Sequence, residues 1–132
     1  MGMTELKKTV LIVDDEEDLT WSISRGLSKD TDQYEVICVN SGTGALEILN
    51  EKSVDLVVTD LRMPGINGMK LLKEVKTNYP DTKVIVMTAY GSLEIKEVLE
   101  HSGTKGYIEK PFEINELRKL IHHYLENIHE II

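Results

Sequence analysis

The chain has 132 residues and a net charge of −8, which suffices for one domain with one core and does not favour a nucleic-acid-binding surface. Its single cysteine, Cys38, lies in an apolar run and allows no internal disulfide. It contains neither a membrane-spanning run of about 18 apolar residues nor a signal pattern. We expect one cytoplasmic domain over 1–132, with its core at about 8–125 and no membrane partner.

The first half of the chain alternates strand-like and helix-like segments. A run rich in valine and isoleucine at 9–14 predicts a buried strand, and leucine or isoleucine at every fourth position then predicts a helix. A second strand is expected at 34–40, and Ser41 is a suitable cap for a second helix. The residues that carry the two helical patterns are Leu19, Ile23 and Leu27, followed by Ala45, Leu46, Ile48 and Leu49.

The second half repeats this alternation. Strands are expected at 54–59, 83–88 and 105–109, each followed by a helical pattern. The fourth helix is expected to end near Gly103. The apolar residues of the third, fourth and fifth helices are Leu71, Leu72 and Val75; Ile95, Val98 and Leu99; and Leu117, Leu120, Ile121, Tyr124 and Leu125. This alternation is typical of a doubly wound α/β domain with a five-stranded parallel sheet.

Acidic residues follow the first predicted strand. Asp14 and Asp15 would repel each other at a buried strand end unless a cation lay between them, and carboxylate oxygens suit Mg²⁺. Acids at a helix start are also favoured by the helix dipole, which accounts well for residues 16–18 but less well for Asp14 and Asp15. The absence of a glycine-rich turn here excludes a dinucleotide site.

Three further polar residues stand where strands end. Asp60 follows the third predicted strand, where a carboxylate beside a metal can act as a nucleophile or serve only as a third ligand. Thr88 ends the fourth strand and could donate to a phosphoryl oxygen or simply cap a turn. Lys110 follows the fifth strand and precedes Pro111, a candidate for a cis peptide bond. Ligands of open parallel sheets gather at this edge.

Four segments together resemble bacterial two-component response-regulator receiver domains: VLIVDDEED, VVTDLRMPGINGMKLL, VIVMTAYGS and GYIEKPF. The resemblance covers about 8–125 and implies the CheY-like, flavodoxin-like (βα)5 fold with strand order 2-1-3-4-5. It also implies a phosphorylation-dependent signalling switch that takes a phosphoryl group from a sensor histidine kinase or phosphotransfer protein. Such a domain catalyses only its own phosphorylation and dephosphorylation.

The resemblance assigns a role to each site residue. Asp60 is the expected phosphoacceptor, and Mg²⁺ is expected on Asp14, Asp15, Asp60 and the backbone carbonyl of Arg62. Lys110 is the expected counter-ion of the phosphoryl group. Thr88 and Tyr107 are the expected switch residues, and they are expected to alter the surface of the fourth helix, fifth strand and fifth helix. That surface would contact an output partner or form a homodimer.

Two other functions remain open from sequence alone. One is a Mg²⁺-dependent phosphohydrolase that works through aspartyl phosphate, and the other is an interaction module independent of phosphate. Two finer predictions concern rate and assembly. The resemblance implies that Arg62 and Tyr90 flank the phosphoryl group, and because both are large we expect them to hinder the attacking water and slow its loss. Ile128 and Ile131 extend an a/d pattern that predicts a linker helix or a dimer seam.

Overall fold

The computed structural model describes residues 7–30, 32–89 and 106–126. The predicted fourth helix, Tyr90, Ile128 and Ile131 all lie outside these residues. The strands are β1 (Lys8–Val13), β2 (Tyr34–Val39), β3 (Leu56–Asp60), β4 (Lys83–Ala89) and β5 (Gly106–Lys110). The helices are α1 (Glu17–Leu27), the 3₁₀ turn η1 (Ser28–Asp30), α2 (Gly42–Glu51), α3 (Gly68–Asn78) and α5 (Ile114–Glu126).

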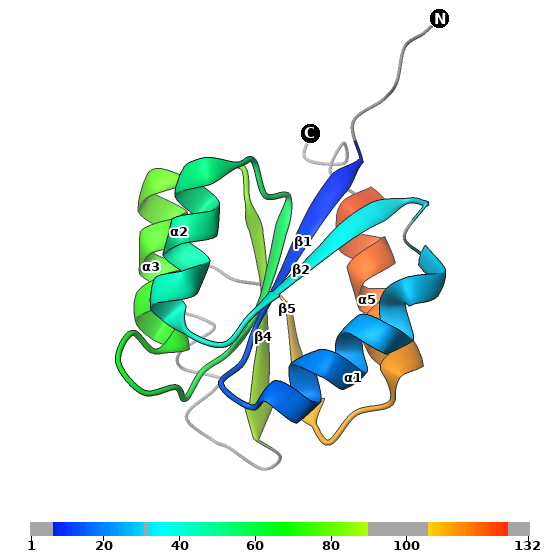
Figure 1. The fold of residues 1–132 in the computed structure, drawn as a ribbon. Coiled ribbons are helices and arrows are strands. Elements are labelled where there is room, and N and C mark those ends of the chain that lie inside the picture. Colours follow the sequence, from blue (N-terminus) through cyan, green and yellow to red (C-terminus); the bar gives the residue numbers. More distant parts are fainter. Residues whose placement is uncertain (1–6, 31, 90–105, 127–132) are drawn as a thin grey trace, which may run out of the picture.

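The five strands form one parallel sheet in the order β2-β1-β3-β4-β5, which confirms the predicted fold class and strand order. Helices α1 and α5 cover one face, and α2 and α3 cover the other (Figure 1). The strand limits differ from the predicted ones by up to two residues. As a result Asp60 and Lys110 are the last residues of β3 and β5, and Asp14 lies just beyond β1.

The residues of β1 show why a parallel strand between two helical layers is apolar throughout. Val10 to Val13 are all completely buried. Val10 and Ile12 belong to the core under α1 and α5, whereas Leu11 and Val13 belong to the core under α2 and α3. Because successive side chains of a strand point to opposite faces, a strand covered on both faces shows no polar alternation.

Capping side chains begin two of the helices. Ser41 Oγ accepts a hydrogen bond from the backbone N–H of Gly44, as predicted for the start of α2. Asn67 Oδ1 accepts in the same way from Lys70 N at the start of α3. Each cap satisfies one of the backbone donors that a first helical turn leaves without a partner.

A buried carboxylate connects the end of α1 to α5. Asp30 is only 4 % exposed and accepts two hydrogen bonds from Arg118, at 2.9 Å from both Nε and Nη2. The Tyr34 hydroxyl donates a third bond at 3.0 Å, and His122 Nε2 lies 3.4 Å away. The hydrogen bonds from Arg118 outweigh the effect of burial and hold the pKa of Asp30 well below its usual range.

The surface of α1 carries the chain's single tryptophan. Trp21 is 61 % exposed, and the Arg25 guanidinium lies 4.9 Å from the centroid of its ring. The inward side of the same helix is buried through Thr20, Ile23 and Leu27.

Among the described residues, no helix combines the length and the apolar character that crossing a membrane would require.

We predict that Arg118→Met lowers the free energy of unfolding by about 1–3 kcal/mol, because Asp30 would remain buried without its main partner. Chemical denaturation at neutral pH measures this loss, and Lys119→Met, an exposed neighbour on α5, serves as the control.

The interaction of Asp30 with Arg118 also predicts how the free energy of unfolding changes with pH. Since folding lowers the pKa of Asp30, its contribution is complete above the pKa of an unfolded aspartate, about 3.9, and is lost as the pH falls toward the lower folded value. The stability gap between wild type and Arg118→Met should therefore narrow in acid. A gap that widens below pH ~4 would contradict this account.

Candidate functional site

Three carboxylates converge at the carboxyl edge of the sheet. Asp14 and Asp15 follow β1, and Asp60 ends β3, the neighbouring strand in the sheet. One oxygen from each of the three side chains lies within 4.8 Å of the others. Asp14 is completely buried, Asp60 is largely buried and Asp15 is exposed. The predicted acidic site is thus assembled by adjacent strands, although Asp15 and Asp60 are far apart in the sequence.

Lys110 supplies a positive charge to the same edge. Its ammonium Nζ lies 2.7 Å from Asp14 Oδ2, 3.2 Å from Asp60 Oδ2 and 3.6 Å from Glu16 Oε1. Burial disfavours the charged ammonium, but the hydrogen bond to Asp14 and the two carboxylate charges outweigh it and raise the pKa of Lys110. The lysine therefore holds its proton firmly and acts as a fixed cation between two strands.

The surroundings of Asp60 disfavour the negative charge of its carboxylate. Burial raises the pKa of its carboxyl above the usual range, and the nearby charge of Asp14 adds to this. Lys110 and the backbone N–H of Arg62 oppose the rise by interacting with the charged form. A carboxylate in this setting gains from any further positive charge brought beside it.

The loop after β3 packs tightly against the backbone of Asp60. Gly68, the first residue of α3, lies so close that an added Cβ would be 2.1 Å from the Asp60 carbonyl oxygen. Its N–H also donates to the Leu61 carbonyl at 3.0 Å. A side chain at position 68 would displace either Asp60 or the start of α3. Glycine here keeps the loop short and Asp60 fixed.

The remaining predicted residues lie at the ends of β4 and β5. Thr88 is buried, and its hydroxyl makes one long hydrogen bond of 3.4 Å to the Ala89 carbonyl. Tyr107 is 42 % exposed, and in the parallel pairing of β5 with β4 it lies opposite Val86. The Lys110–Pro111 peptide bond is cis, as predicted. Arg62 is exposed in the loop after β3, and Tyr90 is outside the described residues.

The donor set fits a hard divalent cation. Among the described residues, Asp14, Asp15 and Asp60 form the one group of acidic, histidine or cysteine side chains close enough together to hold a metal ion. All three offer oxygen, and Mg²⁺ characteristically takes a few carboxylates while it keeps several waters. The partial exposure of the group leaves room for those waters. This acidic cluster could therefore hold a metal.

One polar contact at this edge has no counterpart in the sequence-based prediction. Asn40 follows β2, and its amide Nδ2 donates to the Asp14 carbonyl at 2.8 Å and to Thr20 Oγ1 at 3.0 Å. One feature of the sequence indicates it, because Asn40 is another polar residue at a strand end. Its partners could not be deduced, since they depend on the β1–β2 register and on the position of α1.

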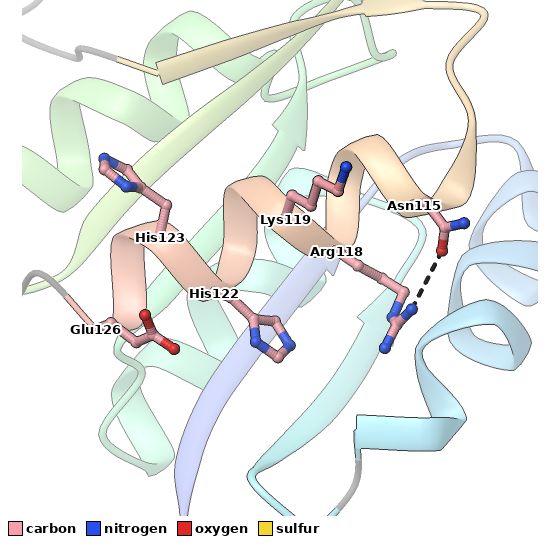
Figure 2. Close-up of a pocket in the computed structure, with 6 residues that line it drawn as sticks. All are labelled: Asn115, Arg118, Lys119, His122, His123 and Glu126. Carbon is pink, nitrogen blue, oxygen red and sulfur yellow. Dashed lines mark hydrogen bonds between the residues drawn. The ribbon is translucent and has the colours of Figure 1, made fainter.

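A second concave surface runs along α5, and none of the three clustered aspartates lines it (Figure 2). Arg118 is turned toward Asn115 and Asp30, whereas His122 and His123 project from the helix in different directions. These side chains do not converge on a common point. The surface is lined by Asn115, Arg118, Lys119, His122, His123 and Glu126.

The sequence of this chain matches a known protein family and several characterised proteins. The profile of the response regulator receiver domain matches residues 10–122. Sporulation initiation phosphotransferase F of Bacillus subtilis is 32 % identical, over 91 % of this chain and 95 % of its own length. The DNA-binding transcriptional regulator NtrC of Escherichia coli is 35 % identical over 89 % of this chain, but the match spans only 25 % of that relative.

Solved structures agree with the sequence matches. A CheY-like response regulator receiver domain protein from Methanospirillum hungatei superimposes with a TM-score of 0.85 and 27 % identity, over 95 % of this chain and 98 % of that one. The family match, the curated relatives and the solved structures agree. The chain therefore belongs to the response regulator receiver domain family of two-component signalling systems.

Proposed function

We propose that the chain is a phosphorylation-dependent switch whose phosphoacceptor is Asp60. The observation that carries the proposal is the placement of Asp60 at the end of β3, with Asp14 and Asp15 oxygens within 4.8 Å and Lys110 Nζ at 3.2 Å. The phosphoryl donor would be a phosphohistidine of a sensor histidine kinase or of a phosphotransfer protein. Since the chain spans a quarter of the NtrC-type relatives, the output of any longer protein is a separate question.

In the proposed reaction an Asp60 carboxylate oxygen attacks the phosphorus of the donor. A P–O bond forms as the P–N bond to the donor imidazole breaks, and the imidazole keeps the electron pair and the proton on its other nitrogen. Mg²⁺ held by Asp14, Asp15, Asp60 and the Arg62 carbonyl would supply positive charge beside the phosphoryl oxygens. Lys110 is already fixed next to Asp60 and contributes the second positive charge.

The catalysis is confined to the domain's own phosphorylation and dephosphorylation. A phosphohydrolase that turns over free esters would need a group that releases a proton to the leaving alcohol. The side chain closest to Asp60 from β5 is Lys110, whose raised pKa makes it a poor proton donor. Arg62, two residues after Asp60, carries a guanidinium that stays charged in proteins.

The output step uses Thr88 and Tyr107. A phosphoryl group adds about −1.5 to −2 charge and strong acceptor oxygens. Among the described residues, the Thr88 hydroxyl has its long hydrogen bond to Ala89 to give up, and its movement would leave space beside β5 for the exposed Tyr107 ring. The β5–α5 side would then change shape and bind an output partner or a second copy as a homodimer.

We predict that acetyl phosphate with Mg²⁺ labels the wild-type chain and that Asp60→Asn shows no adduct by intact-protein mass spectrometry. Chelation of Mg²⁺ should abolish labelling of the wild type, because the acidic cluster would lose its compensating charge. Asp81→Asn, an exposed aspartate after α3, is the matched control and should label normally. Full labelling of Asp60→Asn would refute the assignment.

We predict that Thr88→Val uncouples Tyr107 from the phosphoryl site. With Mg²⁺ and beryllofluoride, a mimic of the phosphoryl group, the ring signals of Tyr107 should shift in NMR spectra of the wild type and stay at their free positions in Thr88→Val. Thr43→Val, an exposed threonine on α2, should respond like the wild type. An unchanged Tyr107 response in Thr88→Val would remove the switch role of the hydroxyl.

A further inference from the structure

The turn that carries Asp14 and Asp15 is held by hydrogen bonds of its backbone and of the Asp14 side chain. Asp15 is exposed, so the direction of its carboxylate depends on the path of the chain between β1 and α1. Two contacts on that path come from Asp14 itself. Its N–H donates to the Val39 carbonyl at 3.2 Å, and its Oδ1 accepts from Glu16 N at 2.8 Å. Asp14 Oδ2 accepts a hydrogen bond from Lys110 Nζ at 2.7 Å.

Asn40 adds a side-chain contact to the same turn from a different strand. Its Nδ2 donates to the Asp14 carbonyl at 2.8 Å, which fixes the peptide group joining Asp14 to Asp15. A rotation of that peptide would redirect the Asp15 side chain. The asparagine is itself anchored by its position directly after β2, whose register with β1 is continuous from Lys8 to Val13.

The second bond of Asn40 extends the contact to α1. The same Nδ2 donates to Thr20 Oγ1 at 3.0 Å, and Thr20 is buried with its hydroxyl donating in turn to the Glu17 carbonyl. The amide therefore connects the acidic turn with the first turn of the helix that follows it. Because the Asn40 side chain is itself exposed, its replacement by alanine removes no packing from the core, although the buried Asp14 carbonyl and Thr20 hydroxyl each lose this donor.

We propose that Asn40 is a positioning residue for the cation site, and that it acts by fixing the Asp14–Asp15 peptide rather than by touching the ion. The inference rests on the proposed function, since it assumes that Mg²⁺ binds at Asp14, Asp15 and Asp60. Partners of metal ligands commonly change metal affinity by 10-fold or more when they are removed. A contact made through the backbone should lie at the lower end of that range.

The test is a calorimetric titration of Mg²⁺ into three variants and the wild type. In Asn40→Ala the dissociation constant should rise roughly tenfold. Thr20→Val removes the acceptor of the second Asn40 bond, together with the hydroxyl's own bond to the Glu17 carbonyl, but it leaves the bond to the Asp14 carbonyl and should change the dissociation constant much less. Asn78→Ala, which removes an asparagine that donates to Glu74 on α3, should bind Mg²⁺ like the wild type. Thermal unfolding without Mg²⁺ shows whether each variant is folded.

Labelling by acetyl phosphate separates positioning from general damage. At saturating Mg²⁺ the rate in Asn40→Ala should return close to the wild-type rate, because Asp60 and Lys110 are untouched, while the Mg²⁺ concentration needed for half of that rate rises. Wild-type Mg²⁺ affinity in Asn40→Ala, or an equal loss in Thr20→Val, would overturn the inference and leave Asp60 phosphorylation standing. A wild-type chain that neither binds Mg²⁺ nor becomes labelled would overturn the proposed function and this inference with it.

Discussion

Electrostatic repulsion among three carboxylates at one sheet edge is the constraint on which the rest of this structure depends. Two unit charges 4 Å apart interact by about 4 kcal/mol at an effective dielectric constant of 20, so a cluster within 4.8 Å is costly without a cation. Lys110 offsets part of this cost from β5. The cost is imposed by the fold, because parallel strands deliver all their carboxyl ends to the same edge. A site with this excess of negative charge favours a nearby cation and disfavours any further negative charge.

Two buried aspartates in this domain show how surroundings give one residue type opposite properties. Asp30 meets a bidentate arginine and a tyrosine hydroxyl, and its pKa is lowered. Asp60 meets burial and the charge of Asp14, and its pKa is raised in spite of Lys110. The first carboxylate has hydrogen-bond donors for both of its oxygens, and through Arg118 it connects the end of α1 to α5. The pKa of the second is shifted against ionisation, and shifts of this kind are more frequent at functional sites than elsewhere.

Most of the fold and the charged part of the site could be predicted from the sequence. Strands covered on both faces leave uninterrupted apolar runs, and Asp14, Asp60 and Lys110 stand out because each interrupts such a run at its end. The contacts of Asn40 could not be predicted, since they require the register of β2 on β1. The Asp30–Arg118 pair joins residues 88 positions apart, and neither local sequence differs from an ordinary polar surface segment. Strand limits shifted because hydrogen bonding, not apolar character, defines where a strand stops.

The exposed indole on α1 makes the intrinsic fluorescence of this protein a surface signal. Because Trp21 is already in contact with water and Arg25, its emission should change little when the core melts, and unfolding curves are better followed by circular dichroism. Trp21 is the residue directly after Thr20, and the Thr20 hydroxyl accepts a hydrogen bond from Asn40 beside the turn that carries Asp14 and Asp15. A molecule that covers α1 would therefore alter the emission at once, so that one chromophore distinguishes association at this helix from loss of structure.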